Sequence, residues 1–310
     1  MSIALAADIG GTHIRTALVD EKGTILYQHR IKADLSVHGQ TDAKAAEDYV
    51  LNTIHDALTD QLHAGKADVC GIGFPGFFAG NTGLLASSPN LPLLAEVRFG
   101  ELLSERIGMP VVIQNDGLAA AVGEFRFGAG KGSENLLHIT LGTGVGGGAV
   151  LHGAPHAGDH GMAMEIGHLT VVRDGRPCGC GAKGCLETYA SATAVTAHFR
   201  KISGMQAADS RAVFNLAQSG NRDARTAIAE AGKYLGIGIA EATKLLDVQN
   251  VTISGGLAGA WSLLHPPLVE SLNTNLIPPL KGKINVLLSR LADDAGLLGA
   301  AALAVDFKKN

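Results

Sequence analysis

The sequence predicts an α/β protein made of two related halves, for three reasons. Its 310 residues exceed the usual size of a single domain, so two domains of about 150 residues are expected. Short apolar segments with strand character alternate with longer helical ones. A strand, a glycine-threonine loop and a second strand occur near the N-terminus and again later, with Gly142 standing 132 residues after Gly10. This spacing indicates a duplication, with a chance repeat of a common unit as the alternative.

The first half begins with strands and continues with alternating helices and strands. Hairpin chemistry at residues 20–23 joins the second and third strands. Apolar positions with a period near 3.6 predict a helix over 41–64, which Gly65 can end. The expected strands are 3–7, 14–19, 24–30, 69–74 and 110–114, and the other helices are 99–107 and 117–125.

The second half is richer in helices. Strands are expected over 136–141, 147–151, 249–254 and 283–289, and helices over 188–202, 210–218, 222–246 and 295–307. We expect an N-terminal α/β domain over residues 1–117 and a larger C-terminal α/β domain over 118–295. The closing apolar helix, about 296–310, is expected to pack back on the N-terminal domain.

The composition is that of a globular enzyme with a sizeable core. It is 46% hydrophobic and 17% charged, which is not the balance of a disordered chain. A net charge of −4 without a basic cluster argues against nucleic acid as a partner. No signal peptide and no apolar run of about 18 residues is found, so no membrane association is expected. Cys70 is interpreted as a buried apolar residue, and the lack of other disulfide candidates predicts a cytoplasmic location.

The most specific motif is the segment 165–187. Cys178, Cys180 and Cys185 fall within eight residues, and His168 stands ten residues before the first of them. Thiolate and imidazole ligands at such spacings are typical of tetrahedral Zn²⁺, whereas a disulfide between neighbours one residue apart would be strained. Four protein ligands fill a tetrahedron. The segment therefore predicts a structural zinc site, held by a loop of the C-terminal domain.

Three glycine-bearing loops follow predicted strands, at 8–12, 142–148 and 254–256. Their exposed backbone N–H groups suit phosphate oxygens, and Asp8 adds a carboxylate able to hold Mg²⁺. None of the loops has the sequence of a P-loop or the strand-to-helix order of a Rossmann fingerprint. Each alone is consistent with a simple hairpin turn. Together they favour a nucleotide held between two domains.

Asp116 is the candidate catalytic base. It stands at the end of a predicted apolar strand, directly before a predicted helix. A carboxylate in this position is either a helix N-cap or a general base. Sequence spacing is compatible with both roles.

These motifs, in this order, resemble the ROK family of bacterial sugar kinases (repressors, open reading frames and kinases). They are Asp8-Ile-Gly-Gly-Thr12, Asn115-Asp116, the glycine loop 141–148, Glu165-Ile-Gly-His168 and the cysteine segment 178–187. The resemblance extends over about residues 3–305. It implies two ribonuclease-H-like domains of the actin-like ATPase superfamily around a cleft, with a structural zinc loop.

The resemblance also implies the activity, an ATP-dependent transfer of the γ-phosphate to a hexose hydroxyl, O6, with glucose most expected. Asp116 would be the catalytic residue. Sugar hydroxyls would be bound by Gly76, Asn90, Asn115, Asp116, Glu165, His168 and Glu187. ATP and Mg²⁺ would be bound by Asp8, Gly10, Gly11, Thr12, Gly142, Thr143, Gly144, Gly255 and Gly256. His168 would ligate zinc through one ring nitrogen and address the sugar through the other, and a homodimer or homotetramer is implied.

Several other functions compete with a glucose kinase. The segments 12–15 and 89–93 resemble allose kinases as much as glucokinases, and kinases of N-acetylmannosamine or N-acetylglucosamine share the same motifs. From another class, a non-catalytic sugar-sensing ROK regulator is the alternative. A DNA-binding repressor is not expected, because only seven residues precede Asp8. A zinc hydrolase is not expected either, since it needs an open metal position.

Overall fold

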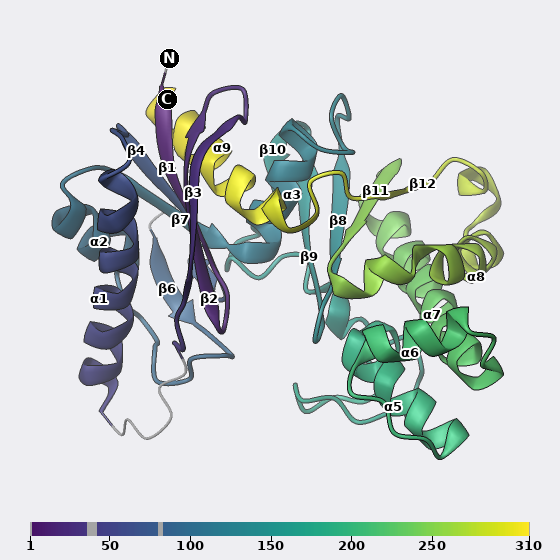
Figure 1. Ribbon diagram of the computed structural model, residues 1–310. Coiled ribbons are helices and arrows are strands. Elements are labelled where there is room, and N and C mark those ends of the chain that lie inside the picture. Colours follow the sequence, from purple (N-terminus) through teal and green to yellow (C-terminus); the bar gives the residue numbers. More distant parts are fainter. Residues whose placement is uncertain (1, 36–41, 80–82, 310) are drawn as a thin grey trace. The chain divides into compact units, whose positions relative to one another are not determined.

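The computed structural model describes residues 2–35, 42–79 and 83–309, and it has a mixed α/β fold (Figure 1). The predicted class is therefore confirmed. Two predicted ends, Thr41 at the start of the first helix and Asn310 at the end of the last, lie outside the described residues. No helix among the described residues combines the length and apolar character needed to cross a bilayer.

The chain forms two compact units. Unit 1 contains the described residues of Met1–Glu134, Gly148–Ala163 and Asp293–Asn310, and unit 2 contains Asn135–Gly147 and Met164–Ala292. Each unit thus draws on separate stretches of sequence. The division into domains at residues 117 and 118 stays a prediction.

The first sheet has the strand order β3-β2-β1-β4-β7. Its strands are β1 (Ile3–Ile9), β2 (His13–Asp20), β3 (Ile25–Lys32), β4 (Val69–Phe74) and β7 (Val111–Asn115). β1 runs antiparallel to β2 and parallel to β4, and β7 runs parallel to β4. Burial explains their composition: the central β4 is buried throughout and reads as an apolar run, whereas the edge strand β3 is largely exposed and polar.

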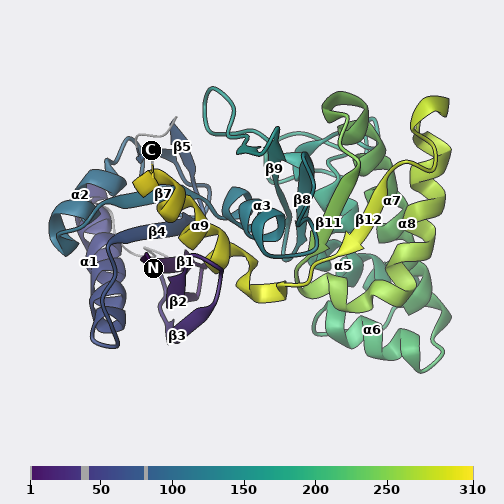
Figure 2. The same cartoon turned by 90° about the horizontal axis from the view of Figure 1, so that it is seen from above.

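Helices cover both faces of the first sheet. Figure 2 shows α1 (Ala43–Leu62) and α2 (Phe99–Ile107) on one side, and α3 (Asp116–Arg126) and α9 (Ala295–Lys309) on the other. Asp42 caps α1 by accepting hydrogen bonds from the N–H groups of Lys44 and Ala45. The helix ends at Leu62, three residues before the glycine expected to stop it. α9 packs against α3, β1 and β4, so the last helix of the chain belongs to unit 1.

The second sheet repeats the plan of the first, with the order β10-β9-β8-β11-β12. Its strands are β8 (Leu136–Leu141), β9 (Val145–Leu151), β10 (Ala154–Pro155), β11 (Asn250–Ser254) and β12 (Asn285–Leu288). β9 and β10 are antiparallel, while β8, β11 and β12 run parallel to their neighbours in that series. In both sheets a hairpin side joins a parallel side, which agrees with the predicted duplication.

The helices of unit 2 differ from the prediction in two places. They are α4 (Glu187–Ala190), α5 (Ala192–Ser203), α6 (Ser210–Gln218), α7 (Arg222–Leu246) and α8 (Trp261–Asn275). The helix expected over 188–202 is broken at Ser191, whose hydroxyl accepts a hydrogen bond from the N–H of Ala194 and caps α5. α8 was not expected, because Pro266 and Pro267 lie in its interior and proline removes a helical hydrogen bond. Its packing along α7 compensates for that loss.

The remaining elements are short. They are the strands β5 (Phe77–Ala79) and β6 (Leu84–Ser87), which pair with each other, and the 3₁₀ turns η1 (Ile166–His168), η2 (Gly256–Ala260), η3 (Pro278–Leu280) and η4 (Ala292–Asp294). Cys70 is fully buried in β4, as the sequence predicts.

Candidate functional site

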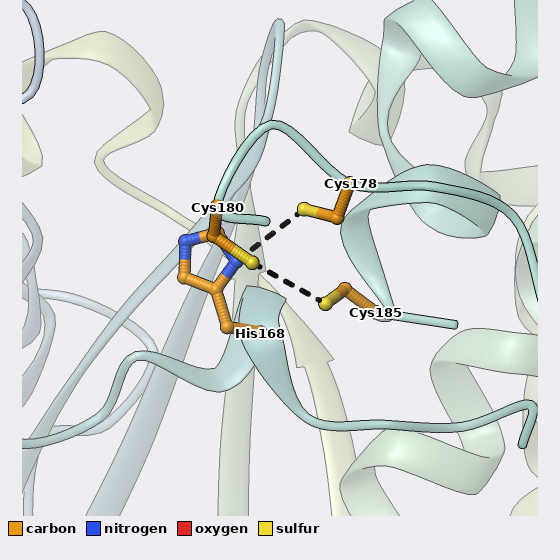
Figure 3. A group of neighbouring side chains, drawn as sticks. All are labelled: His168, Cys178, Cys180 and Cys185. Atoms are coloured by element: carbon orange, nitrogen blue, oxygen red, sulfur yellow. Dashed lines mark hydrogen bonds between the residues drawn. The ribbon is translucent and has the colours of Figure 1, made fainter. Parts of the chain in front are cut away.

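The four predicted metal ligands lie together in unit 2 (Figure 3). Their ligand atoms all lie within 4.8 Å of one another. Cys178 Sγ lies 3.7 Å from His168 Nδ1, and Cys180 Sγ lies 3.7 Å from Cys185 Sγ. With Zn–S near 2.3 Å and Zn–N near 2.0–2.1 Å, the edges of a tetrahedral site are about 3.5–3.8 Å. The cluster therefore has the composition and dimensions of a closed zinc site.

The cysteine loop is held in shape by its own backbone. The N–H of Cys178 donates to the carbonyl of Ala182 at 2.9 Å, and the N–H of Gly181 donates to the carbonyl of Cys178 at 3.1 Å. Gly184 has a φ of +80°, and a side chain there would collide with the carbonyl of Val172. Glycine is thus required at that position.

Arg176 anchors the same loop to the helices behind it. Its guanidinium lies 4.3 Å from the ring centroid of Tyr189 and donates to Glu230 Oε1 at 2.7 Å. It also donates to the carbonyl of Thr188 at 3.0 Å and contacts His198 Nδ1 at 3.0 Å. These contacts connect the cysteine loop with α4, α5 and α7, so one side chain restrains three helices.

The protonation of the cluster depends on its surroundings. Burial raises the pKa of the Cys185 thiol to about 12, and desolvation also raises the pKa of Cys178. The N–H of Ala182 lowers the pKa of Cys180. A cysteine binds a metal as the thiolate, so zinc binding would have to release protons from the thiols of this cluster.

Two carboxylates flank the cluster. Glu165 Oε2 lies 3.7 Å from His168 Nε2, on the side of the ring away from Cys178. Burial raises the pKa of Glu165, and the neighbouring carboxylate of Glu187 raises it further. Glu187 Oε1 accepts from Cys178 Sγ at 3.4 Å. An imidazole between a metal and a carboxylate is fixed in orientation and tautomer.

Glu187 also touches one of the glycine loops. A side-chain carbon added at Gly144 would stand 2.5 Å from Glu187 Oε2. The carbonyl of Gly142 accepts from the N–H of Ala192 at 2.9 Å. The loop at 142–144 is thus braced by the segment that follows the zinc ligands, while Thr143 at its tip is exposed.

The loop at 255–256 lies beside the loop at 142–144, because β11 is the parallel neighbour of β8. Gly255 has a φ of +90°, and a side chain there would collide with the carbonyl group of Leu141. Gly256 is exposed. Unit 2 therefore brings together two of the three loops predicted to bind phosphate.

The third loop lies in unit 1, between β1 and β2. Gly10, Gly11 and Thr12 are exposed, and the N–H of Gly10 donates to the carbonyl of His13 at 2.9 Å. The hydroxyl of Thr12 lies 2.9 Å from His13 Nδ1. These contacts close a tight hairpin turn whose backbone faces solvent.

Asp8 and Asp116 both lie next to Gly73, at the carboxyl ends of the parallel strands of the first sheet. A side-chain carbon at Gly73 would lie 3.7 Å from Asp8 Oδ1 and 3.7 Å from Asp116 Cα. The register explains this, since Asp8 pairs with Gly73 and Phe74 pairs with Asn115 across parallel strands. The carboxyl ends of parallel strands lie together, so two aspartates distant in sequence become neighbours of the same glycine, Asp8 through its carboxylate and Asp116 through its backbone.

Arg15 is a partner of Asp8 that the sequence reasoning missed. Its guanidinium donates to Asp8 Oδ2 and to the carbonyl of Asp293, and it lies 3.4 Å from Asp294 Oδ1. Asp8 and Arg15 are register partners in the antiparallel pair of β1 and β2. A count outward from the hairpin turn at 10–12 would have revealed the pair.

The N-cap of α3 is Asn115. Its Oδ1 accepts from the N–H groups of Gly117 at 2.9 Å and Leu118 at 3.1 Å, and its Nδ2 donates to the carbonyl of Gly76 at 3.2 Å. Asp116 is the first residue of the helix, and its Oδ1 accepts from the N–H of Gly117 at 2.9 Å. Capping is therefore performed by the neighbour, and the N-cap interpretation of Asp116 is wrong.

The other predicted sugar contacts of unit 1 lie in loops. Gly76 is tied to Asn115 as described, and the hydroxyl of Ser88 donates to the carbonyl of Pro75 at 2.6 Å. Asn90 lies in an exposed turn two residues after Ser88. The segments 75–76 and 88–90 are thus both connected to the polar end of the first sheet.

Comparison with known proteins agrees with this arrangement. Residues 4–307 match the ROK family. A glucokinase from Thermotoga maritima is 34% identical over 313 residues, covering 96% of each chain. An N-acetylmannosamine kinase from Yersinia pestis is 30% identical, covering 98% of this chain and 99% of that one. The crystal structure of a ROK family glucokinase from Streptomyces griseus, in complex with glucose and AMPPNP, has a TM-score of 0.82 and 30% identity, covering 98% of this chain and all of that chain.

Proposed function

The chain belongs to the ROK family, and from this premise we propose that it transfers the γ-phosphate of ATP to the 6-hydroxyl of a hexose, with glucose as the preferred substrate. It is an ATP-dependent hexose phosphotransferase. The observation that carries the proposal is the placement of Asp8 and Asp116 around Gly73 at one edge of the first sheet. Phosphoryl transfer needs a base for the attacking hydroxyl and a carboxylate for a divalent cation, and both are available there.

Asp116 acts as the general base in this proposal. It takes the proton from the sugar hydroxyl as the oxygen attacks the γ-phosphate, a role that contributes about 10²–10⁴-fold to the rate. Asn115 caps α3 and holds the backbone of Asp116 in place. The base therefore stands on a rigid helix start rather than on a loop.

The glycine loops bind the nucleotide. Backbone N–H groups of Gly10, Gly11, Gly142 and Gly144 hold phosphate oxygens, with the hydroxyls of Thr12 and Thr143, and Gly255 and Gly256 lie by the adenosine. Asp8 is the carboxylate that would hold Mg²⁺, an ion that usually binds through one or two carboxylates plus phosphates. Its side chain is paired with Arg15 and partly exposed. Mg²⁺ supplies charge neutralisation on the phosphates.

The zinc cluster supports the sugar-binding residues. The sugar hydroxyls form hydrogen bonds with Glu165, His168 and Glu187, and with Gly76, Asn90, Asn115 and Asp116. Zn²⁺, bound by His168, Cys178, Cys180 and Cys185, is structural. It fixes the segment that carries the two glutamates, and no chemical step passes through it.

The sugar preference and the assembly are part of the proposal. Similarity to a protein named glucokinase supports glucose as the first candidate substrate. Similarity to a protein named N-acetylmannosamine kinase makes that amino sugar the second candidate. The resemblance to the ROK family implies a homodimer or homotetramer, and the composition predicts neither nucleic acid nor membrane as a partner. A cytoplasmic location is consistent with ATP as substrate and with thiols kept reduced for a metal.

A sugar panel tests the proposal. Coupled ADP production is measured with glucose, allose, mannose, fructose, N-acetylglucosamine and N-acetylmannosamine, and with 6-deoxyglucose as the control for the attacked oxygen. We expect the highest kcat/KM with glucose and no turnover with 6-deoxyglucose. Asp116→Asn should lower kcat by about 10²–10⁴-fold. No turnover with any sugar would instead identify a sugar-sensing regulator, and a near wild-type rate of Asp116→Asn would remove the base assignment.

A further inference from the structure

A buried polar cluster lies beneath the two glycine loops of unit 2. His138 on β8 is fully buried, and so is Thr252 on β11. His138 Nδ1 lies 2.9 Å from Thr252 Oγ1, and His138 Nε2 lies 3.0 Å from Ser254 Oγ and 3.3 Å from Thr140 Oγ1. The hydroxyls of Thr140 and Ser254 are 3.1 Å apart. Four polar side chains thus stand where apolar ones would fill a sheet.

Strand register places these side chains on one face. His138 pairs with Thr252, and Thr140 pairs with Ser254, across the parallel strands β8 and β11. Each strand contributes positions i and i+2, which point to the same side of a sheet. The pair nearer the strand ends, Thr140 and Ser254, stands directly before the glycine loops.

A neutral histidine can satisfy all of these hydrogen bonds. A neutral imidazole has one N–H and one acceptor nitrogen, and each hydroxyl can both donate and accept. If Nδ1–H donates to Thr252, then Nε2 accepts from Ser254 while the hydroxyl of Thr140 donates to Ser254. The other tautomer is satisfied by reversing these bonds. A fully satisfied buried network makes one arrangement rigid and unique, which an apolar core does less strictly.

We propose that His138 is a positioning residue for the nucleotide: through Ser254 and Thr140 it fixes the separation of the loops at 142–144 and 255–256. This inference rests on the proposed function, in which both loops contact ATP. The loops have little tolerance, because Gly255 already packs against the carbonyl of Leu141. A small shift of either strand end would misplace the N–H groups that face the phosphates, and misplacement lowers affinity.

Two substitutions at His138 separate the two sides of the ring. Glutamine places an amide near Nε2 and can still reach Ser254, whereas asparagine places an amide near Nδ1 and can reach only Thr252. His138→Leu removes both contacts. Ser254→Ala tests the loop side of the network without altering the ring. Thr243→Val is the matched control, since Thr243 is also fully buried in unit 2 but donates only within α7.

Binding of AMPPNP is measured by calorimetry, and the KM values for ATP and sugar are measured by coupled ADP production. We expect His138→Leu and Ser254→Ala to raise the Kd for AMPPNP and the KM for ATP by about tenfold, because the N–H groups of the two loops would no longer stand at the positions of the phosphate oxygens. The KM for sugar should stay within about twofold of wild type. Glutamine should restore most of the AMPPNP affinity and asparagine should not. Thr243→Val should bind AMPPNP as wild type does.

The outcomes are separable from those of the proposed function. A wild-type protein that binds AMPPNP in a His138-dependent manner but turns over no sugar supports the inference and refutes the kinase. Equal AMPPNP affinity in wild type and folded Ser254→Ala overturns the inference, as does rescue by asparagine rather than glutamine. If His138→Leu does not fold, Ser254→Ala still decides. A wild-type protein without AMPPNP affinity overturns both.

Discussion

The loops at 10–12 and 142–144 occupy the same place in two sheets of the same plan, yet they are supported differently. Beside the first loop stands an ion pair, Asp8 with Arg15, which continues to Asp294 before α9. Beneath the second lies the buried hydrogen-bond network of His138, and the side of this loop lies against Glu187. The repeated topology determines where a loop stands, and the side chains that differ between the halves determine what each loop can hold. The first loop is supported by an ion pair, and the second by hydrogen bonds between an imidazole and hydroxyl groups.

The largest expected effect is on the charged support. Asp8→Asn should lower kcat/KM for MgATP by about 10²–10³-fold, the scale seen when one preorganised electrostatic group is removed. The amide removes the charge assigned to Mg²⁺ and leaves Arg15 with a neutral partner. Steady-state kinetics at varied Mg²⁺ measure the change.

Asp293→Asn is the matched control for this variant. Asp293 is exposed and meets Arg15 through its backbone carbonyl, so the same chemical change leaves that contact intact. Its kinetics should be those of wild type. If Asp8→Asn also behaves as wild type, the first loop does not depend on its carboxylate and the comparison fails.

The next largest effect is expected from the loss of one proposed zinc ligand. Cys180→Ser should abolish the binding of one zinc per chain and raise the KM for sugar by about tenfold or more. Loss of an outer partner of a metal site already costs typically 10–100-fold in activity, and Cys180 is one of the proposed ligands. A rise in the Kd for AMPPNP should accompany it, since Glu187 touches both Cys178 and Gly144. Metal analysis of purified protein and initial-rate kinetics provide the readouts.

Cys70→Ala is the companion control, because Cys70 is the one cysteine outside the metal cluster and lies buried in β4. That variant should retain one zinc per chain. Zinc loss from Cys180→Ser with an unchanged KM for sugar would mean that the metal does not organise the sugar-binding residues.

A smaller effect is expected from the anchor of the zinc loop. Arg176→Lys should lower the free energy of unfolding by about 1 kcal/mol, because lysine keeps the charge but loses the planar stacking on Tyr189 and the forked hydrogen bonds. Urea denaturation of the zinc-loaded protein measures the difference. Arg98→Lys, in an exposed pair with Glu101, should change stability by less than about 0.5 kcal/mol. Equal losses in the two variants would contradict the anchoring role.

The smallest effect is expected at Asp294. Its carboxylate is partly exposed and lies 3.4 Å from Arg15, so Asp294→Asn should cost less than about 0.5 kcal/mol. Thermal unfolding is a sufficient measurement. A loss of stability above about 1 kcal/mol would contradict the expectation for an exposed ion pair and show that Asp294 holds Arg15 strongly.

Much of the fold could be predicted because its signals are local. Apolar runs ended by glycine identify β1, β4, β8 and β11, and a regular period identifies α7. α8 could not be found in this way, since Pro266 and Pro267 oppose a helix locally and only contact with α7 offsets them. The break at Ser191 was likewise hidden, because a serine hydroxyl caps a helix only when the chain turns there.

The candidate site divides along the same line. The cluster of His168 with the three cysteines could be predicted, because the cysteines lie within eight residues and short spacing is the signal of a metal site. The pairing of Asp8 with Arg15, and of His138 with Ser254, depends on strand register, which joins residues 7 and 116 positions apart. The N-cap of α3 could not be assigned from the sequence, because Asn115 and Asp116 are adjacent and both side chains accept a hydrogen bond from the N–H of Gly117.

By itself the sequence determined the α/β class, the repeated strand-loop-strand unit and the members of the His168–cysteine cluster, because each follows from preferences of neighbouring residues. The tertiary structure alone decided which groups stand behind each loop: the ion pair at the first, and the imidazole-hydroxyl network and Glu187 at the second. The physical reason is that hydrogen bonds and ion pairs require atoms within a few ångströms, and only the pairing of strands brings distant residues so close.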